Sequence, residues 1–99
     1  MKELFQPNKD QLNLTTILCA LGDPIRLNIV KQLSDMGEIT CSGVGSVLPR
    51  PALSHHFKVL RESGIIHVRI EGKQRFLSIR YNDLEKRFPG LLETILKCV

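Results

Sequence analysis

The stretch PALSHHFKVLRESG, residues 51–64, begins with proline, ends with glycine and repeats apolar residues at helical spacing. Proline is favoured in the first turn of a helix and glycine just after its last turn, so this stretch predicts a helix over 51–63. Successive residues on a helix are rotated by about 100°, which places Leu53, Phe57 and Leu60 on one buried face. The opposite face carries polar side chains: Ser54, His55, Lys58 and Glu62.

The two adjacent histidines of this helix, His55 and His56, raise the question of a metal site. Neighbouring side chains point about 100° apart, whereas a helical metal-binding pair is spaced four residues apart, as in H-E-x-x-H. We therefore expect His56 to be a half-buried, hydrogen-bonded structural residue. His55 faces outward with Ser54 and Lys58, where side chains reach base edges and phosphates when a helix enters the major groove of DNA.

Positive charge is concentrated in the same part of the chain. The 99 residues carry a net charge of +4, and residues 50–80 hold seven basic side chains but only two carboxylates. This asymmetry predicts a polyanionic partner, double-stranded DNA, in preference to a solvated basic face. The candidate DNA contacts are basic and polar residues of this region: Arg50, Ser54, His55, Lys58, Arg61, Arg69, Lys73, Gln74 and Arg75.

Three helical segments are predicted upstream. Apolar residues at helical spacing indicate a helix over about 10–21, closed by Gly22, and a core helix over 24–36, opened by Asp23. A short third helix is predicted within EITCSGVGSVL, residues 38–48, although each of its two glycines costs about 1 kcal/mol relative to alanine.

A β-hairpin and a last helix are predicted downstream. The runs IIHVRI (65–70) and RFLSIR (75–80) flank the four-residue turn EGKQ, a pattern typical of a hairpin. A final helix over about 82–98 contains Pro89, which should kink or restart it. The predicted order is four helices, two strands and a final helix. This order predicts a mainly α fold with a β-hairpin wing (α+β), that is, a winged helix-turn-helix in a single domain of residues 1–99.

Three segments resemble the ArsR/SmtB-type winged helix-turn-helix transcriptional regulators. They are ALGDPIRLNIVKQL (20–33), LSHHFKVLRESGII (53–66) and EGKQRFLSIR (71–80), and the resemblance runs from about Leu14 to Leu96. It implies a cytoplasmic repressor that binds a pseudo-palindromic DNA operator as a homodimer and leaves it when an inducer binds. The inducer is not identified by these residues.

The resemblance also implies which parts of the chain have which role. Helix 51–63 and the wing, residues 66–80, would bind the operator, with contacts at Ser54 and His55 and also at Arg50, Lys58 and the wing. The segment before this helix is about two residues shorter than the family pattern, and Pro49 stands where a capping serine is common. Arg50 would then take the place of the missing serine by contacting a phosphate of the DNA.

A dimer is also indicated by the apolar residues themselves. Seven apolar positions on the C-terminal helix exceed what a 99-residue monomer with four other helices needs to cover, so a partner helix would use the excess. The first and last helices, about 10–21 and 82–98, are the expected dimerisation helices. Their candidate interface residues are Leu14, Ile17, Leu18, Leu21, Leu84, Phe88, Leu91, Leu92, Ile95 and Leu96.

No metal ion or other cofactor is expected. Metal sensors of the resembled family carry paired cysteines in the third-helix region, or histidine and carboxylate ligands along the last helix. In this chain the third-helix region has only Cys41, and the last helix has no histidine. A thiol switch is the alternative, with Cys98 pairing with Cys19 or Cys41. The competing interpretation is that the three cysteines are small packing residues.

An enzyme is not expected, because no nucleophile with a base, no paired carboxylates and no phosphate-binding glycine loop are evident. A zinc-dependent hydrolase using His55, His56 and His67 is the different-class alternative, and its geometry is poor. A second alternative is a module whose basic face binds an acidic protein in place of DNA. No apolar run is long enough for a signal peptide or a membrane span, so no membrane partner is expected.

Overall fold

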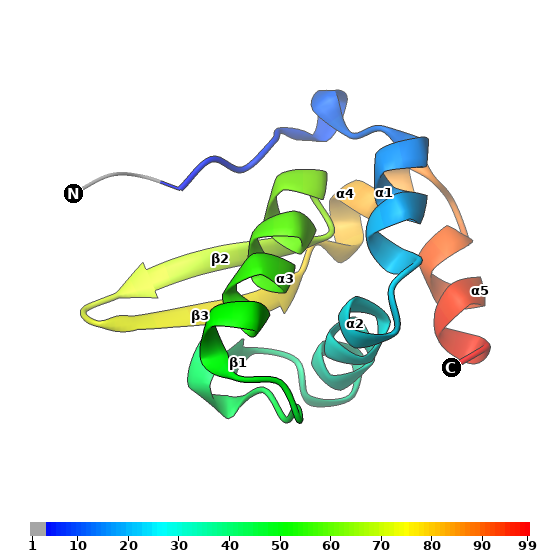
Figure 1. Ribbon diagram of the computed structural model, residues 1–99. Coiled ribbons are helices and arrows are strands. Elements are labelled where there is room, and N and C mark those ends of the chain that lie inside the picture. The colour runs from blue at the N-terminus through cyan, green and yellow to red at the C-terminus, as the bar shows by residue number, and fades with distance from the viewer. Residues whose placement is uncertain (1–3) are drawn as a thin grey trace.

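The computed structural model of the protein describes residues 4–99. The helices gather on one side, and the hairpin β2–β3 extends from them as an arm, with α3 beside its base (Figure 1). The elements, in chain order, are η1 (Lys9–Gln11, a 3-10 helix), α1 (Leu14–Leu21), α2 (Pro24–Met36), β1 (Ile39–Thr40), η2 (Cys41–Gly43, a 3-10 helix), α3 (Arg50–Ser63), β2 (Ile66–Glu71), β3 (Gln74–Ile79), α4 (Tyr81–Arg87) and α5 (Leu91–Lys97).

The first two helices begin at capping side chains. Asn13 accepts a hydrogen bond from the backbone N–H of Thr16, so α1 starts at Leu14 and not near residue 10 as the apolar spacing predicts. The residues before it form the separate 3-10 turn η1. Asp23 caps α2 in the same way, through the N–H of Arg26, and its bounds agree with the predicted 24–36. In both cases a side-chain oxygen satisfies an N–H that has no partner inside the helix.

The predicted third helix within 38–48 is wrong. Ile39 and Thr40 form β1, which pairs with Leu77 and Phe76 of β3, and η2 follows as a single 3-10 turn. β-branched residues favour strands, and the glycines that follow disfavour a helix, so pairing with β3 prevails. The winged helix-turn-helix therefore has a strand and a 3-10 turn before α3 in place of an α-helix.

The helix α3 is oriented as its apolar spacing predicts. Leu53, Phe57 and Leu60 are buried, whereas His55 is exposed and His56 half-buried. Gly64 ends the helix in the left-handed conformation, at a φ of 87°. A Cβ at that position would lie 2.1 Å from Cδ2 of Leu12, so glycine is required both by the backbone and by the close approach of Leu12.

The hairpin turn is shorter than predicted. Glu71 and Gln74 pair with each other as the last residues of β2 and β3, leaving a two-residue turn of Gly72 and Lys73 in place of the four residues EGKQ. Gly72 has a φ of 61° and Lys73 a negative φ, the pattern of a type II′ turn. A type II′ turn matches the right-handed twist of paired strands. The two strands therefore stay paired up to a loop of only two residues.

The C-terminal helix restarts at Pro89, as predicted. Chain direction changes across Phe88–Gly90, where Gly90 adopts a φ of 77°, and the segment divides into α4 and α5. Buried residues from the helices and the sheet form one hydrophobic cluster, with Ile17, Leu33, Leu60 and Leu77 almost completely inaccessible. Within residues 4–99 no helix is long and apolar enough to cross a membrane.

The N-terminal segment is held against the wing and α3. The side-chain amide of Gln6 donates to the carbonyl of Val68 (3.0 Å) and accepts from its N–H (2.9 Å), so it occupies the free edge of β2. Arg80 donates to the carbonyl of Pro7 and also pairs with Asp83. These bonds fix the base of the hairpin relative to the helices.

Candidate nucleic-acid interface

The outer face of α3 displays three of the predicted DNA contacts. Ser54, His55 and Lys58 are exposed, and their orientation is set by Leu53 and Phe57, which anchor the opposite face in the core. Hydroxyl, imidazole and ammonium groups can all make hydrogen bonds to base edges or phosphates. The structure therefore presents a polar, solvated helix face of the kind that enters a major groove.

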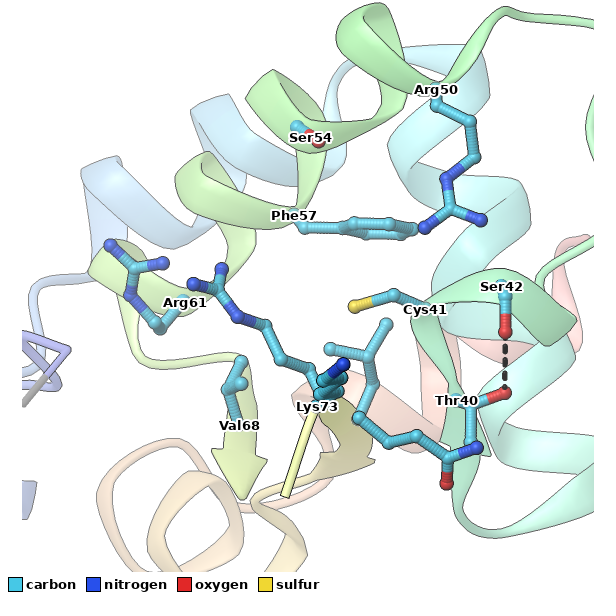
Figure 2. A pocket seen from close by; sticks show the side chains of 12 residues that line it. Thr40, Cys41, Ser42, Arg50, Ser54, Phe57, Arg61, Val68 and Lys73 are labelled. Atoms are coloured by element: carbon cyan, nitrogen blue, oxygen red, sulfur yellow. Dashed lines mark hydrogen bonds between the residues drawn. The ribbon is translucent and has the colours of Figure 1, made fainter. Parts of the chain in front are cut away.

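A cavity of about 280 Å³ lies between α3, η2 and the hairpin. Figure 2 shows Arg50 reaching into it from the start of α3, with Cys41 entering from η2. Lys73 and Arg75 line it from the hairpin. The cavity thus brings Arg50 together with Lys73 and Arg75, which follow it by 23 and 25 residues in the sequence.

Four cationic side chains in this region have no internal partner. Within residues 4–99, Arg50, Lys58, Lys73 and Arg75 make neither an ion pair nor a side-chain hydrogen bond. All four are exposed. Their charge is uncompensated, so they are available to an anionic partner. Gln74, also exposed, lies beside two of them at the end of the hairpin.

Two other predicted contacts are already used within the protein. Arg69 pairs with Glu38 at 2.9 Å and with Glu71, and its guanidinium stacks over the ring of Phe76 at 4.3 Å. The hydrogen bonds to Glu38 and Glu71 raise the pKa of Arg69 further. Arg61 donates to the carbonyl of Phe5 at 3.0 Å, and its side chain is only 11% exposed. The structure therefore separates Arg61 and Arg69 from the free cations.

Sequence reasoning missed the partner of His56. Nη1 of Arg26 lies 3.2 Å from Nδ1 of His56, and the carboxylate of Asp23 lies 3.8 Å from the same nitrogen. The hydrogen bond from the Arg26 backbone N–H, together with the nearby charge of the Arg26 side chain, lowers the pKa of Asp23. Arg26 stands 30 residues before His56, so no local pattern signals their contact.

The predicted dimer residues fall into three groups by exposure. Ile17, Leu21, Leu84 and Leu92 are buried in the protein's own core. Leu14 and Leu18, one turn apart on α1, are 43% and 44% exposed. The remaining four are half-buried: Phe88, Leu91, Ile95 and Leu96. An apolar surface is therefore available on α1 and α5. It includes fewer residues than predicted, because four of the predicted interface residues are buried in the core.

The cysteines occupy three separate environments. Cys19 on α1 and Cys98 after α5 are exposed, and the thiol of Cys98 donates to the carbonyl of Thr94 at 3.3 Å. Cys41 is half-buried in the cavity beside α3, where burial raises the pKa of its thiol and Arg75 and Arg50 oppose that shift. Among residues 4–99, no three histidine, cysteine or carboxylate side chains are grouped so that they could hold a metal ion.

Comparison with known proteins agrees with this geometry. A helix-turn-helix domain family matches residues 21–69. An uncharacterised HTH-type transcriptional regulator of Bacillus subtilis, YceK, is 35% identical over 94 residues, which cover 92% of this chain and 93% of that protein. An ArsR family transcriptional regulator of known structure superposes with a TM-score of 0.68 and 26% identity, covering 91% of this chain and 92% of the other. The chain belongs to the ArsR-type helix-turn-helix transcriptional regulators.

A second ArsR-type neighbour, the transcriptional repressor BigR from Xylella fastidiosa, has a TM-score of 0.58 and 31% identity over 76% of this chain and 85% of BigR. The relatives of this ArsR-type chain are transcriptional regulators and not enzymes, which argues against the hydrolase alternative. The winged helix-turn-helix expected from the order of elements is confirmed by these neighbours. In this fold α3 directly precedes the hairpin β2–β3, which forms the wing.

Proposed function

We propose that the protein is a homodimeric, sequence-specific repressor that places α3 in the major groove of a pseudo-palindromic operator and lays the hairpin on the flanking backbone. The observation that carries this proposal is the group of four exposed cations, Arg50, Lys58, Lys73 and Arg75, which have no partner within residues 4–99 and surround an exposed polar helix face. Uncompensated cations release condensed counterions from DNA when they neutralise phosphates, which drives binding. Residues 1–99 act in this proposal as one DNA-binding domain.

The side chains divide by reach and chemistry. Ser54 and His55 lie near the start of α3 and face outward, so we assign them to base edges. The four free cations, with Gln74, are assigned to phosphates and the adjacent minor groove. Arg61 and Arg69 are assigned to holding the N-terminal segment and the wing in place, because their donors are already engaged.

A two-fold dimer would supply the second recognition helix. The exposed pair Leu14 and Leu18 on α1 and the half-buried apolar residues of α5 form the surface that a second copy would cover. Self-complementary apolar faces are typical of two-fold interfaces. Repression is proposed because BigR, which shares this fold, is a transcriptional repressor. Such a protein acts on chromosomal DNA, and we therefore propose that it works in the cytoplasm.

The test is selection of bound duplexes from a random pool, followed by quantitative binding of the selected duplex and of a random duplex at several salt concentrations. We expect an inverted repeat, and an affinity that falls steeply as salt rises. Enrichment of no sequence would contradict the proposal. Binding of an acidic polypeptide that random DNA cannot displace would favour the protein-binding module instead.

A further inference from the structure

One guanidinium group joins three helices of this protein. Nε of Arg26, on α2, donates to the carbonyl of Ala20 at 2.6 Å, and Nη2 lies 3.4 Å from the carbonyl of Cys19. Both carbonyls belong to the last turn of α1, and that of Cys19 also accepts from the N–H of the capping Gly22 at 3.2 Å. Nη1 of the same group reaches Nδ1 of His56, on α3, at 3.2 Å. Arg26 therefore connects the end of α1 to the recognition helix.

This contact assigns the hydrogen-bonding roles of the two side chains. A guanidinium group can only donate hydrogen bonds, so Nδ1 of His56 accepts from Nη1 of Arg26. The carboxylate of Asp23 lies 3.8 Å from the same nitrogen, and the ring centroids of His55 and His56 are 5.7 Å apart. The side chain of His56 is only 15% exposed, on the side of α3 that meets α2.

We propose that Arg26 and His56 are positioning residues, which fix the rotation of α3 about its own axis so that His55 and Ser54 meet the bases. This inference rests on the proposed DNA-reading role of α3. It distinguishes the two adjacent histidines: His55 contacts DNA, and His56 holds the helix that carries it. The same bonds tie α3 to the end of α1, whose exposed face we assign to the dimer.

The physical reason is the sensitivity of base contacts to helix rotation. Side chains end about 5–6 Å from a helix axis, so a rotation of roughly 15° moves their tips by more than 1 Å. Hydrogen bonds to base edges tolerate only a few tenths of an ångström. Phosphate contacts made by long, flexible lysine and arginine side chains tolerate more. Loss of the Arg26–His56 bond should therefore reduce sequence preference more than general affinity.

The bond itself can be tested without DNA. In the nitrogen-15 spectrum of the free protein we expect a slowly exchanging Nη1 signal for Arg26 at neutral pH. This signal should be lost in His56→Ala and kept in His56→Asn, because the asparagine oxygen can accept at about the position of Nδ1. An Nη1 group that exchanges freely in the wild type would overturn the inference.

The consequence for DNA reading is tested with the selected duplex and a random duplex. We expect His56→Ala and Arg26→Lys each to weaken binding of the selected duplex about tenfold and that of random DNA less than twofold, with His56→Asn restoring most of the loss. The double variant Arg26→Lys/His56→Ala should bind no more weakly than the weaker single variant, because each single substitution already removes the shared Arg26–His56 bond. Asn82→Ala, which removes an exposed polar side chain on α4, outside both this contact and the hairpin, is the control.

The outcomes separate this inference from the proposed function. If the wild type does not prefer the selected duplex, both fail. If the wild type does, but His56→Ala and Arg26→Lys keep its preference, only the positioning role fails. Additive losses in the double variant, or failure of His56→Asn to restore preference, would show that His56 acts through some other contact. Circular dichroism of each variant at the assay temperature establishes that the compared proteins are folded.

Discussion

Residues of the same type have opposite roles on the basic face of this protein. Arg75 and Arg69 are both exposed on the hairpin and look equivalent in the sequence. Arg75 has no partner among residues 4–99, whereas Arg69 is held by Glu38, Glu71 and the ring of Phe76. Opposite charge nearby, and not residue identity, therefore decides which arginine is available to a phosphate.

The first prediction separates base contacts from phosphate contacts. Ser54→Ala or His55→Ala should cost about 1–3 kcal/mol on the selected duplex and relax its sequence preference. Lys73→Ala or Arg75→Ala should weaken all duplexes about equally and reduce the salt slope by about one. Arg69→Gln is the control, and its slope should not change. Fluorescence anisotropy across salt concentrations measures both quantities, and identical behaviour of the two groups would contradict the assignment.

The second prediction concerns the thiols. If the protein responds to oxidation, we expect a disulfide of Cys98 with Cys19, because both are exposed, whereas burial raises the pKa of Cys41 and disfavours its reactive thiolate. Mild oxidant should then lower DNA affinity in the wild type and leave Cys98→Ser and Cys19→Ser unaffected. An unchanged affinity, with no disulfide in the mass spectrum, would leave the cysteines as packing residues.

Whole elements begin and end where a few residues dictate. Asp23 caps the start of α2 and Gly64 ends α3, as the local pattern predicts. The segment after Gly37 departs from prediction because β1 gains hydrogen bonds from β3, a partner more than 30 residues away in the chain. Local propensity there was weak, so tertiary pairing determined the element.

The third prediction tests the two turn glycines. Gly64→Ala should destabilise the protein by roughly 2–4 kcal/mol, because it places a Cβ at positive φ and displaces Leu12. Gly72→Ala also has positive φ, but nothing lies within 4 Å of the added carbon, so a loss of about 1–2 kcal/mol is expected. Urea unfolding gives both values. Equal losses would show that the contact with Leu12 is unimportant.

The fourth prediction follows from the lowered pKa of Asp23. A carboxylate whose pKa is lower in the folded state stabilises the fold above its unfolded pKa, and this contribution is lost as pH falls through the folded value. Asp23→Ala should therefore lower the melting temperature at pH 7, with a smaller difference from wild type below pH 4. Asp35→Ala, which removes an exposed carboxylate late in α2, is the control. A difference independent of pH would show that the carboxylate charge does not matter.

At the scale of the whole molecule, the apolar surface that the core does not use lies on α1 and α5. Leu92 belongs to the core, so its replacement would report on folding and not on assembly. Leu14 and Leu18 are exposed and suit a test of assembly. Of the predicted interface residues, Leu14 and Leu18 are therefore better positions for that test than Leu92.

The fifth prediction is that Leu14→Glu or Leu18→Glu yields folded monomers that bind the selected duplex at least tenfold more weakly, because each would bury a charge in the proposed interface. Sedimentation velocity at micromolar concentration measures the oligomeric state. Val47→Glu, a substitution at a 95% exposed apolar residue elsewhere, should leave the dimer intact. A wild-type monomer under these conditions would refute the proposed dimer.

Local pattern was sufficient for α2, α3, the hairpin and the restart at Pro89, because caps, glycine stops and apolar periodicity act within one or two turns of the chain. It was also sufficient for the outward orientation of Ser54, His55 and Lys58. Tertiary structure decided β1, the engagement of Arg69 and the bond between Arg26 and His56. The last two join residues 31 and 30 positions apart. Contacts at such distances depend on how elements pack against one another, and periodicity along the chain carries no record of that packing.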